Sequence, residues 1–404
     1  MKRIYYLQRI ILSVLLLLPL SGCFDSDINR KMYEADDDEM QRENHIVGAT
    51  LRVMQGLVSP TREHLYQFMD AMAGGAYGGY MEGIVDTWVM KFSTFNPEQG
   101  WLKSPFADPI TDLYPQYLKM LSVTDDPVAL ALGKILRVCV MHRVTDIYGP
   151  IPYSQMLSND NLGENLSVPY DSQEQVYTQM LKELEEADKV LEENKDLSSE
   201  AFRKLEDLYY GNISKWRKFL HSMQLRIAMR MSYVNPTEAQ RIAQNAVAAG
   251  VIEANEDNAM LHVAENRSEL LFNNWNDYRI SADLVSVMKG LINLYSKQII
   301  SSTDPYLWMN AAEVTFLRAE GALRGWDMGG EPQALYEKAI ALSFEERGAT
   351  GADKYVKDAE KKPVKYVDPM GAYSADAVSE ITIAWEQGAG KEIFERNLDR
   401  IITQ

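Results

Sequence analysis

The spacing of apolar residues restricts the fold of this chain more than any other feature of its sequence. From Ile46 onward, apolar residues recur every three or four positions, which places them on one face of an α-helix. One such face follows Pro127 and comprises Leu132, Ile135, Leu136, Cys139 and Val140. The alternation typical of half-buried strands is scarce. The sequence therefore predicts a mainly α fold.

Capping residues predict where several helices begin. Asp126-Pro127 suits a helix start, with the aspartate as cap and the proline in the first turn. Asp171 followed by Glu174 has capping-box spacing, so we expect the next helix to open there. Asn235-Pro236 is expected to end the helix after that, and Thr237 to begin a fourth.

Two later helices resemble a tetratricopeptide repeat. We expect them at Leu307–Arg324 and Pro332–Arg347, on either side of the glycine-rich turn Gly325–Gly330. The small residues of Ala319–Ala322 suit a close helix crossing, and Leu335–Ile340 resembles the second helix of the repeat. Helix pairs recur along the chain without a fixed period. We therefore expect a diverged scaffold of tetratricopeptide-like helix pairs with irregular loops.

The N-terminus has the parts of a lipoprotein export signal. A basic start leads into a mostly apolar run at residues 10–20, and Leu20-Ser21-Gly22-Cys23 follows. The run is shorter than the roughly 20 residues needed to span a bilayer. The tetrapeptide resembles the lipobox at which the lipoprotein signal peptidase cuts. We expect residues 1–22 to be a signal peptide and Cys23 to be the lipidated first residue of the mature protein.

Lipidation defines how the mature chain is organised. Two or more acyl chains, such as palmitate, give stable membrane anchoring. Residues 23–45 are polar and acidic and are interpreted as a flexible tether, which leaves residues 46–404 as the folded domain. Asp25 and Asp27, just after Cys23, resemble a signal for transfer to the outer leaflet in Bacteroidetes. A solvated linker has the same composition.

The charge of the chain excludes some partners. Cleavage after residue 22 removes three positive charges, those of Lys2, Arg3 and Arg9, and no negative charge. The formal charge therefore changes from −17 to −20. Such an acidic protein repels nucleic acid and anionic lipid. The second cysteine, Cys139, has no partner once Cys23 is acylated, and its apolar neighbours favour a buried, inert thiol.

The sequence contains no recognisable catalytic or metal-binding motif. No Cys-x-x-Cys or Gly-x-Ser-x-Gly occurs, and none of the histidines falls at His-x-x-x-His spacing: His45, His64, His142, His221 and His262. The 58 acidic residues are too many for a glycosidase pair to be recognised by spacing. We therefore expect no metal site, no cofactor and no enzymatic activity.

Aromatic and amide clusters are the candidate ligand contacts. The glycine-rich segment 74–80 precedes several aromatic residues, and loops at 70–105 and near 255–280 are expected to contact the ligand. Tyr and Trp rings stack on the apolar faces of sugars, while amides bind hydroxyl groups. The alternative is that the aromatics pack a loop onto the helices and the amides cap a helix. The candidates are Tyr77, Tyr80, Trp88, Trp101, Asn274, Trp275 and Tyr278, and Phe92 and Phe95 lie in the same stretch.

Other conspicuous residues are interpreted as structural. Trp216 lies on an apolar helix face and is expected in the core, and Tyr336 is expected to pack within the repeat. Arg226 and Arg230 lie one turn apart, a spacing that suits an anion clamp, although a solvated or ion-paired helix face is favoured. Thr382–Glu392 and the Asp125-Asp126 pair are interpreted as solvated surface or caps.

Three segments together resemble the SusD/RagB family of Bacteroidetes. Arg143–Tyr153 (RVTDIYGPIPY) resembles the family's helix exit, commonly Asp-x-Tyr-Gly-x-x-Pro-Tyr. Trp216–Arg230 resembles its Trp-x-Lys-Phe-x-Asn-Ser-Leu-x-x-Arg helix, and Ala312–Ala322 its Ala-Glu-x-x-Phe-x-x-Ala-Glu-Ala repeat helix. These segments stand in the family's order behind a lipobox, and the resemblance covers residues 23–404.

The resemblance implies a function and a location. Members are nutrient-binding lipoproteins of the outer membrane, which face the cell exterior and form a lid over a SusC-like TonB-dependent transporter. The expected ligand is an oligosaccharide or a peptide. From the residues alone, two other functions stay open: a surface glycosidase or peptidase, and a tetratricopeptide-like scaffold that binds another protein.

The sequence departs from the family in two places. The stretch from Lys289 to Pro305 is shorter than in relatives, so loops that shape the ligand site are expected to be missing. Relatives also continue beyond the equivalent of Gln404. The apolar stripe of the last expected helix, which comprises Ile393, Phe394, Leu398 and Ile401, is therefore expected to be partly uncovered.

The lipobox yields a direct prediction. Replacing Cys23 with alanine should leave the protein soluble or uncleaved, because the acyl chains supply its affinity for the membrane. Cell fractionation and the size of the product measure this. A variant that stays in the outer membrane at the size of the mature protein would show that the lipobox interpretation is wrong.

Overall fold

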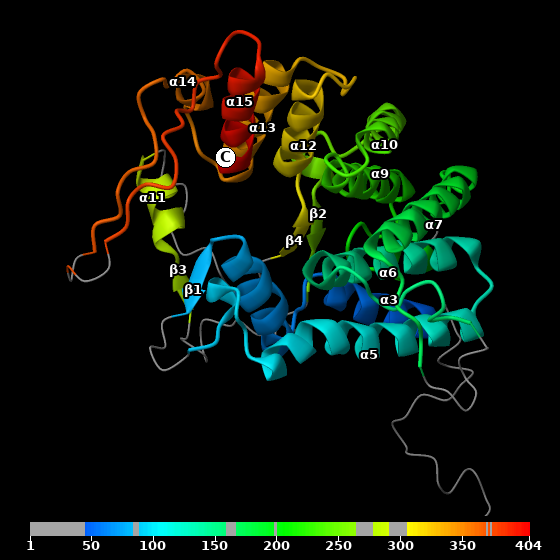
Figure 1. Cartoon of the computed structure of the whole chain (residues 1–404). Coiled ribbons are helices and arrows are strands. Elements are labelled where there is room, and N and C mark those ends of the chain that lie inside the picture. The colour runs from blue at the N-terminus through cyan, green and yellow to red at the C-terminus, as the bar shows by residue number, and fades with distance from the viewer. Residues whose placement is uncertain are drawn as a thin grey trace, which may run out of the picture. The chain divides into compact units, whose positions relative to one another are not determined.

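Helices dominate the part of the chain that the computed structural model describes, which is residues 45–83, 89–158, 167–197, 200–263, 278–290, 305–368, 371 and 374–404 (Figure 1). The predicted mainly α fold is confirmed. The longer helices are α3 (His45–Val58), α5 (Gln99–Val123), α6 (Pro127–Tyr148), α7 (Gln173–Glu193), α9 (Ile213–Arg230), α10 (Pro236–Ala249), α11 (Ala282–Gly290), α12 (Ala311–Leu323), α13 (Pro332–Glu346) and α15 (Lys391–Thr403). The shorter ones are α4 (Glu63–Tyr66), η4 (Gln67–Gly75), η5 (Phe92–Thr94), α8 (Glu200–Arg203), η7 (Asn255–Asp257) and α14 (Ala352–Tyr355).

The helix starts follow capping chemistry, with two corrections. Asp126 Oδ1 caps α6 by accepting from the Val128 amide at 2.9 Å, as predicted. The cap of α7 is Ser172, which forms a capping box with Gln175, so the predicted start at Asp171 is one residue early. Asp171 instead accepts from the amides of segment 153–154. The cap of α10 is Asn235 rather than Thr237, because Pro236 already occupies the first helical turn.

Two short antiparallel strand pairs join segments that are distant in sequence. β1 (Met81–Gly83) pairs with β3 (Tyr278–Ile280), and β2 (Ala259–Leu261) pairs with β4 (Tyr306–Met309). The expected helix over Leu307–Arg324 is therefore wrong at its beginning. Residues 306–309 form a strand, because they hydrogen-bond to β2, and the helix starts only after the Asn310 cap.

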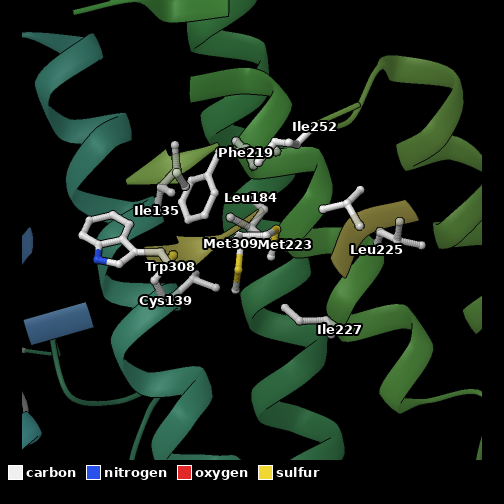
Figure 2. Close-up of a cluster of buried hydrophobic side chains, with 14 of the residues drawn as sticks. Ile135, Cys139, Leu184, Phe219, Met223, Leu225, Ile227, Ile252, Trp308 and Met309 are labelled. Atoms are coloured by element: carbon white, nitrogen blue, oxygen red, sulfur yellow. The ribbon is translucent and has the colours of Figure 1, made fainter. Parts of the chain in front are cut away.

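The core lies between successive helix pairs. α6 packs against α7, α9 against α10 and α12 against α13, as the expected helix pairs require. Figure 2 shows side chains of α6, α7, α9 and β4 meeting in this interior. Trp216 and Tyr336 are fully buried, which confirms their interpretation as packing residues. Among the described residues, no helix has both the length and the apolarity needed to cross a membrane.

The tetratricopeptide-like pair packs closely where small residues were predicted. Ala319 and Ala322 are buried, and a Cβ at Gly321 would lie 2.9 Å from Met328 Cγ. This separation is shorter than carbon atoms tolerate, so a larger residue at position 321 would force the buried Met328 side chain to move. The ring of Phe316 then meets that of Tyr336 edge-on at 6.0 Å across the pair.

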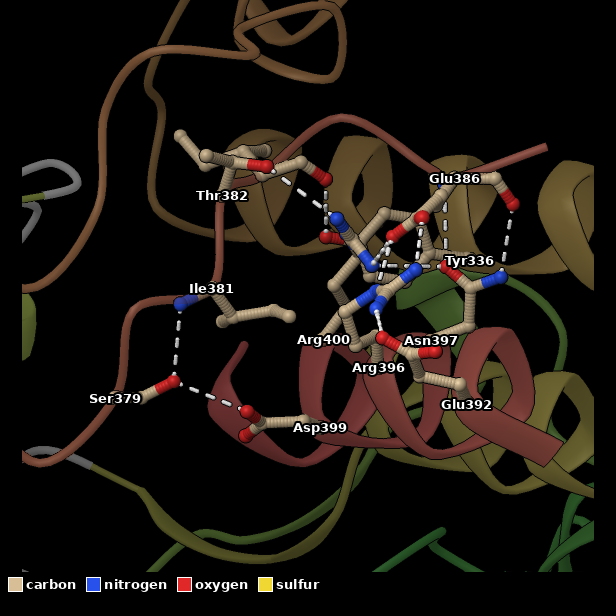
Figure 3. Close-up of polar contacts among 11 residues, drawn as sticks. Tyr336, Ser379, Ile381, Thr382, Glu386, Glu392, Arg396, Asn397, Asp399 and Arg400 are labelled. Atoms are coloured by element: carbon tan, nitrogen blue, oxygen red, sulfur yellow. Dashed lines mark hydrogen bonds and ion pairs between the residues drawn. The ribbon is translucent and has the colours of Figure 1, made fainter.

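The segment before α15 is held in place by polar contacts (Figure 3). Arg396 Nε donates to Glu386 Oε2 at 2.7 Å, and Asn397 Nδ2 donates to the Glu386 carbonyl at 2.9 Å. Tyr336 Oη donates to the carbonyl of Ile383, whose side chain is buried. The interpretation of Thr382–Glu392 as solvated surface or caps is therefore wrong for Ile383, whereas Glu386 is ion-paired and partly exposed.

The apolar stripe of α15 packs against the body of the domain. Leu398 and Ile401 are buried, and α15 packs against α12. Ile393 and Phe394 are half-buried. The expectation that this stripe is partly uncovered is wrong for Leu398 and Ile401, because α12 offers an apolar surface that local sequence does not reveal.

A buried ion pair connects three helices. Arg137 of α6 donates to Glu183 of α7 at 3.0 Å, and both side chains are almost fully buried. Arg137 also donates to the Tyr153 carbonyl at 2.8 Å and contacts Tyr114 of α5. Tyr153 Oη donates to the second oxygen of Glu183 at 2.7 Å. Every buried charge in this group is thus matched by a partner.

This ion pair predicts a large mutational effect. Glu183→Gln should lower the free energy of unfolding by about 3 kcal/mol, because it leaves the Arg137 charge buried without a counter-charge. The matched control is Glu186→Gln on the same helix, where the partly exposed pair with Lys134 should contribute less than about 1 kcal/mol. Urea unfolding of both variants measures the difference, and equal losses would contradict the prediction.

A buried histidine in α6 makes stability depend on pH. Burial, together with Arg230, Arg226 and Arg143, lowers the pKa of His142 from 6.5 to about 3, although Asp146 opposes the shift. Below pH 6.5 the unfolded chain binds a proton that the native state does not bind. The contribution of this group to stability is therefore lost as the pH falls from 6.5 toward 3.

The comparison with His142→Phe isolates this effect, since phenylalanine preserves ring packing against Tyr177 but does not titrate. Between pH 7 and pH 5, the wild type should lose about 2 kcal/mol of unfolding free energy relative to the variant. Urea unfolding of both proteins at the two pH values measures this loss. If His142 titrates normally in the native state, the difference in unfolding free energy between the two proteins would be the same at pH 7 and pH 5.

Candidate functional site

The candidate ligand surface begins at an unusual helix. η4 is a π-helix over its full length, a rare geometry that is frequent at functional sites. A short helical turn follows, and Gly79, with φ of 74°, leads into β1. The expectation of loops over residues 70–105 is therefore wrong at both ends. Its start belongs to η4, and its end belongs to α5, a helix that runs through the buried Pro105.

Strand pairing brings the two predicted ligand-contact segments together. β1 and β3 align Met81 with Ile280 and Gly83 with Tyr278. The Ser281 amide donates to the Tyr80 carbonyl at 2.9 Å, which extends the pairing into the turn before β1. Residues near 80 and near 280 thus form one continuous backbone unit.

Polar contacts attach the segment after β1 to the same unit. Lys91 Nζ lies 3.0 Å from Glu82 Oε1, and Ser93 Oγ donates to the same oxygen at 2.7 Å. Lys91 Nζ also donates to the Gly83 carbonyl at 3.2 Å. The Glu82 carboxylate therefore fixes the position of η5 relative to β1.

The aromatic residues of this region form a layered cluster. Tyr77 meets buried Phe92 edge-on at 5.5 Å and lies parallel to Phe95 at 5.2 Å, with 13° between the ring planes. Burial raises the pKa of Tyr77. Trp101, in the first turn of α5, is half-buried and packs against the same cluster. The rings of Tyr77 and Trp101 thus pack within this cluster.

Phe95 combines an exposed ring with a left-handed backbone at the C-terminal end of η5. Its side chain is 76% exposed, and its φ of 55° lies in the left-handed region that non-glycine residues rarely adopt. Its amide donates to the Phe92 carbonyl at 2.9 Å and its ring stacks on Tyr77, and these two contacts support the left-handed backbone. In the sequence Phe95 lies in the aromatic stretch but outside the set of candidate ligand contacts. The turn-forming Asn96-Pro97 after it was the available signal.

The other predicted site residues have different outcomes. The Tyr80 side chain is 56% exposed on the turn before β1. Cys23, Trp88, Asn274 and Trp275 lie outside the described residues. We define the aromatic surface as Tyr77, Tyr80 and Phe95.

The arginines and the cysteine of the interior are structural. Arg226 pairs with Glu313 at 2.7 Å, and Arg230 pairs with Asp146 at 2.6 Å, which confirms the favoured interpretation as ion-paired residues. Burial raises the pKa of Cys139 to about 12, so its thiol is protonated and inert. Within the described ranges, no three His, Cys, Asp or Glu side chains are grouped to hold a metal ion.

Solved structures similar to this chain are SusD homologues. One from Bacteroides thetaiotaomicron is 48% identical, with a TM-score of 0.81 over 88% of this chain and 80% of the other. One from Bacteroides ovatus is 33% identical, with a TM-score of 0.79 over 89% and 83%. A chitin-binding homologue from Flavobacterium johnsoniae is 32% identical, with a TM-score of 0.76 over 89% and 82%. No curated protein sequence matches the chain.

The family comparison covers nearly the whole chain. The model described as "SusD-like: Susd and RagB outer membrane lipoprotein" matches residues 27–293 and 289–404. The chain therefore belongs to the SusD-like family of outer membrane lipoproteins and is a nutrient-binding protein of the SusD type.

Proposed function

We propose that this protein binds glycans through its aromatic surface and passes them to a SusC-like TonB-dependent transporter. The single observation that carries the proposal is the exposed ring of Phe95, held in a left-handed conformation and stacked on Tyr77. A solvent-exposed ring that is carried by a strained backbone and stacked on a second ring suits contact with a ligand better than it suits packing.

The chemistry of this surface favours a sugar. Hexose rings have apolar C–H faces that stack on aromatic side chains, and Phe95 and Tyr80 both expose such side chains. The β1–β3 pairing, together with the Glu82 contacts, holds the surface in a fixed shape, which reduces the entropy lost on binding. The chitin-binding homologue supports chito-oligosaccharides as the first ligand to test.

The rest of the proposal concerns anchoring and transfer. The protein is held to the outer face of the outer membrane by acyl chains on Cys23, with residues 23–45 as a tether. It acts without catalysis, as a lid over the transporter. Co-purification from mildly solubilised membranes tests the partnership, and recovery of the protein without any TonB-dependent barrel would contradict it.

The contribution of Phe95 to ligand binding can be tested with a variant that removes its ring. Phe95→Asn removes the ring but tolerates the left-handed backbone, because asparagine adopts it more readily than phenylalanine. We expect it to weaken chito-oligosaccharide binding more than tenfold, equivalent to about 1.4 kcal/mol, with the melting temperature nearly unchanged. Isothermal titration calorimetry and a thermal melt measure the two quantities.

The matched control is Tyr210→Asn. Tyr210 is also an exposed aromatic residue, with a φ of 50°, but it lies outside the aromatic surface. The Tyr210→Asn variant should bind chito-oligosaccharides with the affinity of the wild type. Equal affinity for Phe95→Asn and the wild type would remove Phe95 from the site. If a glycan and peptide array instead selects peptides, the proposed ligand class is wrong.

A further inference from the structure

A second exposed aromatic ring lies on the segment that leads into α7. The Tyr170 side chain is 61% exposed. Its ring lies nearly parallel to that of Phe106 in α5, with the ring centroids 5.9 Å apart and 10° between the ring planes. Phe106 is half-buried and packs against the main core. We define the Tyr170 platform as Tyr170 and Phe106.

This platform repeats the arrangement at Phe95. In both places an exposed ring covers a less exposed ring in nearly parallel geometry, since only 13° separates the ring planes of Phe95 and Tyr77. The one other parallel pair among the described residues, His142 and Tyr177, is buried. The outer face of a ring that is stacked on one side and exposed on the other is an apolar surface on which a sugar can stack.

Shared supports connect the Tyr170 platform with the aromatic surface. Tyr148, at the end of α6, meets Phe106 edge-on at 5.2 Å, and its hydroxyl group donates to the Leu102 carbonyl of α5. Leu102, Ile147 and Tyr77 pack against the same cluster of buried residues. Burial raises the pKa of Tyr148, and the nearby Tyr77 adds to this shift. The beginning of α5 and the end of α6 therefore support both exposed rings.

The backbone next to Tyr170 is held in a fixed position. The Asp171 amide donates to the Ile151 carbonyl at 2.9 Å, and the Ile151 amide donates to the Asp171 carbonyl at 3.2 Å. The Asp171 carboxylate accepts from the Ser154 amide at 2.7 Å and from the Ser154 hydroxyl group at 2.8 Å. Because this segment is already ordered, a ligand that stacks on Tyr170 loses less entropy on binding.

We propose that the Tyr170 platform is a second sugar-binding subsite, and that the protein binds an extended glycan chain across both platforms. This inference rests on the proposed function, because the same glycan contacts Phe95. Two contacts made by one chain share a single loss of translational freedom, so the second contact adds affinity only for chains long enough to reach it. The ligand is therefore a linear oligosaccharide rather than a single sugar unit.

Titration calorimetry of the full mature chain with chitobiose and chitohexaose tests this inference. The wild type should bind the hexamer more tightly than the dimer, because only the hexamer can reach both platforms. Tyr170→Ala should weaken hexamer binding about tenfold, equivalent to about 1.4 kcal/mol, and leave dimer binding unchanged. Tyr170→Phe keeps the ring and should bind the hexamer with nearly the affinity of the wild type.

The matched control is Tyr233→Ala. The Tyr233 side chain is 72% exposed and its ring lies 4.5 Å from the guanidinium carbon of Arg324, so it is a supported aromatic ring outside both platforms. This variant should keep the wild-type affinity for both oligosaccharides. Phe95→Asn, in contrast, should weaken the binding of dimer and hexamer alike.

Two kinds of failure can be distinguished. If the wild type binds neither oligosaccharide, chito-oligosaccharide binding is wrong at Phe95 and at Tyr170, and the inference falls with the proposed ligand. If the wild type binds the hexamer but Tyr170→Ala binds it equally well, only the second subsite is wrong. Equal losses of dimer and hexamer affinity in Tyr170→Ala would also overturn the second subsite, and in both cases glycan binding at Phe95 would stand.

Discussion

The buried guanidinium of Arg137 imposes the strictest condition on this fold. A charge removed from water is tolerated only when hydrogen bonds and a counter-charge replace the lost hydration. Here Glu183 supplies the charge, the Tyr153 carbonyl accepts another N–H, and the Tyr153 ring lies 4.1 Å from the guanidinium carbon. These groups come from α6, α7 and the segment after α6. A different packing of these elements would leave the charge unmatched, so the arrangement is specific.

Buried polar groups fix other junctions in the same way. The Glu206 carboxylate accepts from the amides of Leu208, Tyr209 and Gly211, which shapes the turn before α9, and from Gln55 of α3. Arg226 of α9 pairs with Glu313 of α12. The apolar core alone favours any compact packing of helices, whereas these directional contacts select one. The result is a rigid frame on which small irregular elements can be held.

The residues of the proposed ligand site lie where irregular structure replaces the helical frame. The π-helix η4, the short β1–β3 pair and the left-handed Phe95 are all unfavourable or marginal alone. They persist because α5 and α6 support them through the cluster around Phe92. A pocket lined by residues of η4, α6, α9 and β4 contains the unpartnered nitrogens of His142 and Trp308. Stability in the helices therefore compensates for strain and unsatisfied groups at these sites.

The sequence by itself determined the features that depend on neighbours within one or two helical turns. Apolar periodicity gave the helix pairs and the burial of Trp216 and Tyr336, and Asp126-Pro127 gave the start of α6. The caps of α7 and α10 were displaced by one or two residues, because several adjacent polar residues suit the same role. Only the tertiary structure decided that residues 306–309 form a strand, that residues near 80 and 280 are paired, and that Phe95 is strained and exposed. These features depend on hydrogen bonds and packing between segments far apart in the chain, and no local pattern encodes them.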